Sequence, residues 1–109
     1  DETYDLDIAR QPIQLLHVGA GHTRGDIVVF LPEERTLIFG DLLGAGQPFM
    51  RPNDAVPAEW GPTLMKLQEM NWDNAVPGHG WVDNPRDRIE IFISYLTDLS
   101  KHSTLQITT

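Results

Sequence analysis

The alternation of apolar and polar stretches along the chain predicts a small α/β fold. We expect strands at residues 13–18, 27–31, 36–39 and 74–77, and helices at residues 57–70 and about 85–99. The strand segments are rich in β-branched and other apolar residues and are bounded by turn-forming residues. Residues 1–10 are polar and acidic, which indicates a lead-in or an edge strand.

Both predicted helices begin at a proline and carry an apolar stripe. Pro57 and Pro85 suit the first helical turn, where a missing amide hydrogen costs nothing. Asn84 can accept a hydrogen bond from the free amides at the start of the second helix. The stripes consist of Trp60, Leu64 and Leu67 in the first helix and Ile89, Phe92, Ile93, Leu96 and Leu99 in the second.

The element order is therefore β-β-β-α-β-α, which predicts one domain of residues 1–109 with a mixed sheet and two helices on one face. Residues 27–31 are apolar at every position, so we expect this strand to be covered on both sides. Two helices can cover one face of such a sheet. The other face needs cover that the chain itself does not contain.

Three polar residues follow strands that are expected to run in the same direction. His22 follows the first predicted strand, Asp41 the third and His79 the fourth. The hairpin connection at residues 32–35 and the helical crossover set these directions. Strands that run the same way end at one edge of the sheet, so the three side chains should converge there. Two imidazoles and a carboxylate suit Zn²⁺, with Fe and Mn as alternatives.

Each candidate ligand also has an interpretation that needs no metal. His22 would be a turn histidine bonded to backbone groups, Asp41 a capping carboxylate, and His79 a tight-turn residue between two glycines. Asp26 is expected to be a structural turn residue. Arg24 either binds an anionic substrate or lies on the surface.

Other polar and aromatic residues are assigned structural roles. His17 lies within a predicted strand, and His102 lies beyond the last predicted helix. Residues 42–56 are predicted to be a long loop that either lines a pocket or forms an exposed connection. Packing of helix against sheet is the expected role of the three tryptophans, Trp60, Trp72 and Trp81.

Composition limits the partners. The formal net charge is −8, which argues against non-specific nucleic-acid binding and against docking on anionic membranes. No apolar run approaches the ~20 residues of a membrane span, so the chain is expected to be soluble. There are no cysteines, so any metal must be held by nitrogen and oxygen ligands.

Three segments resemble, in order and spacing, the later motifs of the metallo-β-lactamase superfamily. They are Gly21-His22-Thr23-Arg24-Gly25-Asp26, Leu37-Ile38-Phe39-Gly40-Asp41 and Val76-Pro77-Gly78-His79-Gly80. The resemblance spans about residues 17–99 and implies the C-terminal half of an αββα sandwich. It implies that His22 is the third histidine of a first metal, Asp41 a carboxylate bridging two metals, and His79 the histidine of the second. Aspartate at position 41 is more similar to the hydrolase and glyoxalase II branches than to enzymes with a thiolate there.

The family's upstream His-x-His-x-Asp-His cluster has no match in this sequence. The resemblance therefore implies half of a dinuclear zinc hydrolase, whose metals polarise a carbonyl or phosphoryl group. We expect this half to be weakly active or inactive unless an N-terminal half or a partner completes it. The alternative is a non-catalytic module derived from that fold, which dimerises through its bare sheet face. A third hypothesis is a β-sheet module unrelated to the family.

Overall fold

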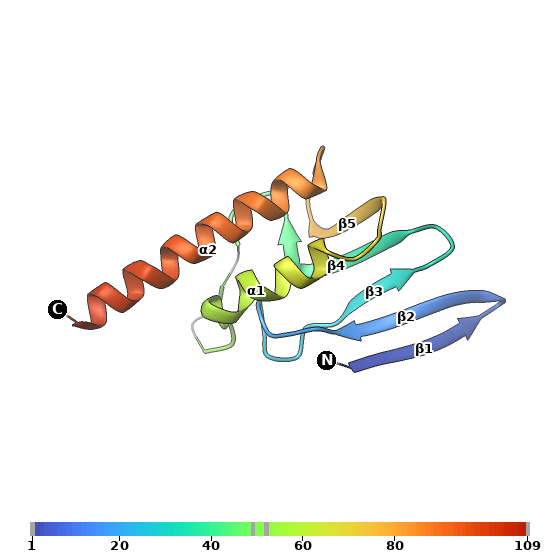
Figure 1. Ribbon diagram of the computed structural model, residues 1–109, viewed down its shortest axis with the longest axis horizontal. Coiled ribbons are helices and arrows are strands. Elements are labelled where there is room, and N and C mark those ends of the chain that lie inside the picture. Colours follow the sequence, from blue (N-terminus) through green and yellow to red (C-terminus); the bar gives the residue numbers. More distant parts are fainter. Residues whose placement is uncertain (1, 49, 52, 109) are drawn as a thin grey trace.

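The computed structural model describes residues 2–48, 50–51 and 53–108, with side chains through residue 101 (Figure 1). Its elements are β1 (Glu2–Ile8), β2 (Gln11–His17), β3 (Val28–Leu31), β4 (Thr36–Gly44), α1 (Pro57–Gln68), β5 (Asn74–His79) and α2 (Pro85–Thr108). The sheet order is β1-β2-β3-β4-β5. Strands β1 to β4 pair antiparallel in sequence, and β5 pairs parallel with β4 after the α1 crossover.

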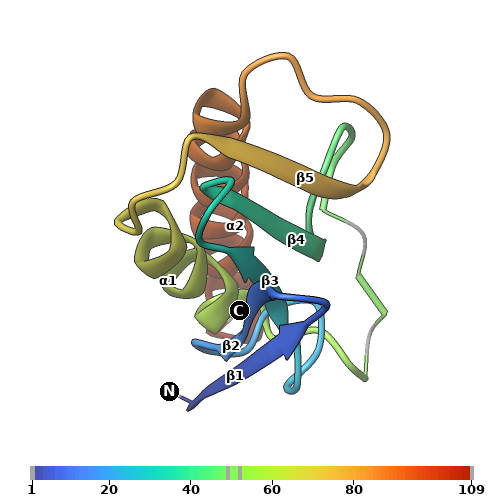
Figure 2. The same ribbon diagram turned by 90° about the vertical axis from the view of Figure 1, so that its right-hand side faces the viewer.

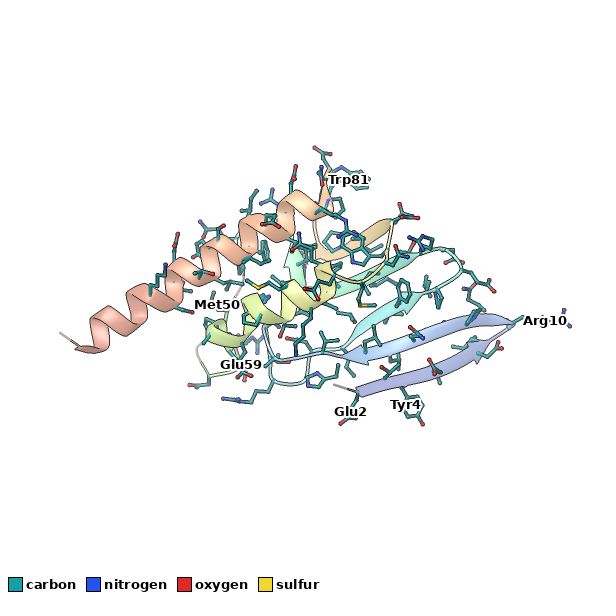
Figure 3. All side chains as sticks on the ribbon, in the orientation of Figure 1. Glu2, Tyr4, Arg10, Met50, Glu59 and Trp81 are labelled. Carbon is teal, nitrogen blue, oxygen red and sulfur yellow. The ribbon has the colours of Figure 1, made fainter. Side chains whose placement is uncertain are left out.

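The sheet has one strand more than the predicted β-β-β-α-β-α order. Strand β1 pairs with β2 at the edge, which confirms the edge-strand interpretation of residues 1–10. Ala9 and Arg10, with φ of 52° and 69°, make the two-residue turn between them. Arg10 marks the tip of this hairpin, far from the helices (Figure 3).

Several predicted element boundaries differ from the observed ones by one or two residues, among them the end of β5, which includes His79. Two elements extend further than that. Strand β4 continues to Gly44, although the strand was expected to end at Phe39, because pairing with β5 carries it past Gly40. Helix α2 continues to Thr108, so His102 lies within this helix and not beyond it. The side chain of His102 lies outside the described residues. Neither helix, as far as the chain is described, has the length and apolarity needed to cross a membrane.

The hydrophobic core lies between one face of the sheet and both helices, which lie on the same side of the sheet (Figure 2). This confirms the prediction of two helices on one face. Burial of apolar surface there is the main force that holds helices to sheet. The fully buried core side chains include Leu37 and Phe39 from β4, Trp60, Leu64 and Leu67 from α1, and Ile89, Phe92 and Leu96 from α2.

The three tryptophans do not share one role. Trp60 and Trp72 are buried, and their indole nitrogens donate to the carbonyl oxygens of Leu42 and Leu67. The expectation for Trp81 was wrong, because this side chain is 82% exposed. Trp81 lies in the connection from β5 to α2, where neither helix covers it, and its indole donates to Asp83 (Figure 3).

The opposite face of the sheet carries a row of apolar side chains without helical cover. The registers place Tyr4, Leu15, Val29, Ile38 and Val76 side by side across all five strands. We call this set the open-face row. Tyr4 and Val76 at its ends are 68% and 45% exposed, and the three central residues are partly buried. Strand β3 is thus tightly covered only on its helix side, where Val28 is buried, and not on both sides as predicted.

A fork of hydrogen bonds fastens the β3–β4 hairpin to the connection before β5. The Arg35 guanidinium donates to the Asp73 carboxylate at 2.7 Å and to Asn71 at 2.6 Å. The hydrogen bond from Arg35 lowers the pKa of Asp73 below its ordinary value. Both side chains are solvent-exposed, so the contact fixes position more than it stabilises the fold.

The parallel pairing of β4 and β5 requires glycine at position 78. A β-carbon there would collide with backbone atoms of Gly40 and Asp41. We expect Gly78→Ala to lower the free energy of unfolding by about 1–3 kcal/mol, because the backbone must shift to admit the methyl group. Thermal unfolding followed by circular dichroism measures this.

Gly25→Ala is the matched control, because a β-carbon at position 25 meets no atom within 4 Å. This variant should unfold within about 0.5 kcal/mol of the parent chain. Equal stability of the two variants would mean that β4 and β5 are not as closely paired as described.

Candidate metal centre

A hydrogen-bonded turn between β2 and β3 positions His22. The Gly21 amide donates to the Thr23 carbonyl at 2.9 Å, and the Gly21 carbonyl accepts from the Val56 amide at 2.8 Å. The Asp26 carboxylate accepts from both the amide and the hydroxyl of Thr23, which confirms its structural role. The His22 side chain is 15% exposed.

The buried indole of Trp60 packs against this turn. Its ring meets the His22 imidazole edge to face, with 6.0 Å between ring centroids. Gly21 lies so close to Trp60 and Leu42 that a side chain at position 21 would collide with both. A larger residue just before His22 would therefore require the buried side chains of Leu42 and Trp60 to shift.

Asp41 is a strand residue and does not lie in a loop, contrary to the prediction. The pairing with β5 jumps from Gly40–Pro77 to Gly44–His79, so β4 bulges between these two pairs. Gly40 takes a φ of 60° at the start of the bulge. Such a bulge turns side chains out of the regular pleat, and the Asp41 side chain is 45% exposed.

His79 is the last residue of β5 and the most exposed of the three. Its carbonyl accepts from the Ala45 amide at 3.0 Å, which joins it to the end of β4. Gly80 follows with a φ of 77°, a conformation that lets the chain turn away immediately. The His79 side chain is 79% exposed.

The structure brings the three predicted side chains together around Asp41. One carboxylate oxygen lies 2.7 Å from His79 Nε2, and the other lies 3.7 Å from His22 Nδ1. Within the described part of the chain, no group of three or more His, Cys, Asp or Glu side chains is arranged so that it could hold a metal ion by itself. Each histidine approaches a different oxygen of Asp41, so the carboxylate lies within reach of both imidazoles.

The three residues line a cleft of about 590 Å³. Its other described lining residues are Leu43, Gly44, Ala45, Gly46, Gln47, Arg51 and Phe92. Most come from residues 42–56, which supports the pocket-lining interpretation of that segment. Sequence reasoning missed Arg51 and Gln47 individually, because a polar side chain in a long loop carries no spacing signal. Arg24, the cation considered from the sequence, is exposed and lies outside the lining.

Comparison with known proteins gives the same family from sequence and from fold. Residues 1–82 match the model of the metallo-beta-lactamase superfamily. The chain is 32% identical over 83 residues to the metallo-beta-lactamase type 2 of Bacteroides fragilis, covering 72% of this chain and 33% of that protein. It is 29% identical over 80 residues to the alpha subunit of 2,4-dinitroanisole O-demethylase of Nocardioides sp. (strain JS1661), covering 73% of this chain and 24% of that protein.

Two solved structures have a similar fold. A metallo-beta-lactamase from Pontibacter korlensis superposes with a TM-score of 0.77 at 24% identity, covering 88% of this chain and 46% of that one. The metallo-beta-lactamase FIM-1 from Pseudomonas aeruginosa, in its mono-zinc form, gives 0.73 at 25% identity, covering 92% and 45%. The chain thus spans less than half the length of these relatives. Its fold and its sequence together show that the chain belongs to the metallo-beta-lactamase superfamily.

Proposed function

We propose that this chain contributes His22, Asp41 and His79 to a dinuclear zinc site of a hydrolase. Superfamily membership gives it a metal-dependent hydrolase-type fold, and members generally bind metal ions such as zinc. The observation that carries the proposal is the position of Asp41, which offers one oxygen on the side of each imidazole. A carboxylate so placed suits a bridge between two ions. Imidazole and carboxylate donors suit Zn²⁺, and Fe or Mn can substitute.

The chain's own residues account for the orientation of these donors. Trp60 and the turn at Gly21 hold His22, the β4 bulge holds Asp41, and the backbone bond to Ala45 holds His79. Leu43 and other apolar residues of the cleft would exclude water from part of a bound substrate. When bound, the ions would supply polarisation of a carbonyl or phosphoryl group.

The donor count supports a further part of the proposal, that ligands from elsewhere complete the site. With Asp41 shared, each ion would receive one histidine and one carboxylate oxygen from this chain. A catalytic zinc ion normally has three protein ligands and one open position. We therefore propose that another half of the domain or a partner supplies the missing donors. By itself the chain would be weakly active or inactive.

Zinc titration tests the assignment of ligands. Isothermal titration calorimetry should detect zinc uptake by the unaltered chain, and His22→Ala, Asp41→Asn or His79→Ala should each weaken it by at least about tenfold, because ligand loss should cost no less than loss of a supporting contact. Circular dichroism of each variant verifies that the fold is retained.

His17→Ala is the matched control for zinc uptake. The His17 ring bonds to the Asp26 carbonyl and lies outside the cleft lining. Its zinc affinity should equal that of the unaltered chain. If the double variant His22→Ala/His79→Ala kept full affinity, the ions would bind elsewhere and the proposed site would be wrong.

The open-face row favours a second candidate function, a self-associating module without catalysis. The row carries no charged side chain, although 24 of the 109 residues are charged (Lys+Arg 8 and Asp+Glu 16). An uncharged apolar sheet face can pack against another such face at about 10 Å. A second copy of the chain, or the other half of a sandwich, would supply it.

Light scattering over a range of protein concentrations tests this candidate. We expect the purified chain to self-associate, and Tyr4→Lys/Val76→Lys to shift it toward the monomer, because two exposed apolar residues of the face become charged. Ile91→Lys is the control, since Ile91 is 53% exposed on α2. A parent chain that stays monomeric at every concentration would contradict self-association.

A further inference from the structure

We propose that Thr63 of α1 is a positioning residue, which keeps the His22 imidazole where it can bind a metal ion. The inference rests on the proposed zinc site and adds a residue that does not itself line the cleft. Among the described residues, Thr63 is the one buried residue with a polar, non-aromatic side chain, and 2% of it is exposed. A polar group this deep in the core needs a hydrogen-bond partner, and its partner belongs to the turn that carries His22.

The Thr63 hydroxyl lies between two carbonyl oxygens. One belongs to Ala20, two residues before His22, at 2.7 Å, and the other to Glu59, one turn earlier in α1, at 2.9 Å. The hydroxyl has one proton, so it donates to one of these oxygens at a time. The bond to Glu59 is a usual contact of threonine within a helix, whereas the shorter bond to Ala20 joins the helix to the turn. A β-carbon at position 19 would collide with the hydroxyl, so no side chain fits between the two segments.

Two further donors join α1 to the same turn. The Lys66 ammonium donates to the Val18 carbonyl at 3.2 Å, and the amide of Val56, just before the helix, donates to the Gly21 carbonyl at 2.8 Å. The Lys66 bond is exposed to water, which can replace it, but the bond from Thr63 to the turn is buried. Loss of the Thr63 hydroxyl would therefore leave a buried carbonyl without its donor and favour a shift of the turn.

The same helix also contacts the backbone beside Asp41. Trp60, three residues before Thr63 and on the same face of α1, donates to the Leu42 carbonyl. Neighbouring side chains of one helix thus bind the strand that carries Asp41 and the turn that carries His22. The 3.7 Å between His22 Nδ1 and the Asp41 carboxylate depends on both contacts. Metal ligands need such supporting contacts to keep their orientation.

Thr63→Val tests the inference, because valine closely matches the shape of threonine and lacks the hydroxyl. In the metal-free chain, we expect the NMR resonances of the His22 ring to shift, since this ring lies against the Trp60 indole, and those of His79 on β5 to stay unchanged. Zinc affinity, measured by isothermal titration calorimetry, should fall about tenfold, as for loss of other contacts that support a ligand. Thr63→Ser keeps the hydroxyl and should restore both the resonances and the affinity.

Thr97→Val is the matched control. The Thr97 hydroxyl donates to the Ile93 carbonyl within α2, at an exposed position of the helix. Its loss should change neither the His22 resonances nor zinc affinity. Circular dichroism verifies the fold of each variant. If Thr63→Val does not fold, the unaltered chain still tests the inference, because the buried Thr63 hydroxyl proton should exchange slowly with water, and rapid exchange would contradict the bond to Ala20.

The outcomes separate this inference from the proposed function. Unchanged His22 resonances in Thr63→Val would overturn the inference, and so would equal shifts at His22 and His79, which would mean a general loosening of the fold. Unchanged zinc affinity in Thr63→Val, or a Thr63→Ser variant that behaves like Thr63→Val, would also overturn it. If the unaltered chain takes up no zinc while the His22 resonances still depend on the hydroxyl, the positioning contact stands and the proposed zinc site falls.

Discussion

The arrangement of the candidate site depends on the indole of Trp60. This side chain is completely buried, and it touches three separate parts of the chain. Its nitrogen donates to the Leu42 carbonyl at 3.1 Å, directly after Asp41 in β4. Its ring meets His22 on one side and Phe92 of α2 on another. A buried indole nitrogen without an acceptor costs about 1–3 kcal/mol, so α1 fixes the backbone beside Asp41 as it packs.

Both helices lie on the same side of the sheet, and two parts of the molecule are left exposed to solvent. On the sheet, the open-face row leaves Tyr4 and Val76 in contact with solvent. At the cleft, exposure rises from His22 through Asp41 to His79, with 15%, 45% and 79% of the respective side chains exposed. The His22 end of the cleft, which Trp60 supports, is largely shielded from solvent, and the His79 end, where β5 ends, is exposed to solvent. Any further donors to the site would approach most readily from the His79 side.

Much of the fold could be predicted because its local signals agree with its packing. The apolar stripe of α1 is buried as expected, and that of α2 is buried at Ile89, Phe92 and Leu96 but only half-buried at Ile93 and Leu99. Asn84 accepts from the Asp87 amide at the start of α2. The shared direction of three strands was enough to predict that His22, Asp41 and His79 come together. That prediction needed only the order of elements and the length of each connection.

The remaining features depend on contacts that the sequence does not display. Ala9 and Arg10 adopt positive φ without the glycine or asparagine that normally signals such a turn, so β1 could be described only as a lead-in or an edge strand. Gly40 suggested the end of a strand, whereas pairing with β5 carries β4 beyond it. Trp81 shows that an aromatic residue near the site need not be buried. Arg51 reaches the cleft through tertiary contacts of its loop.

The bulge in β4 sets where the side chain at position 41 points, and the residue type at that position sets which donor atom it carries. Between the paired residues, β4 uses four steps from Gly40 to Gly44 where β5 uses two from Pro77 to His79. The direction in which residue 41 points is therefore set by how many residues the strand contains, and not by which residue stands there. Exchanging the side chain at position 41 would alter the donor atom and leave the geometry in place, whereas deleting one neighbour would aim any donor away from both histidines.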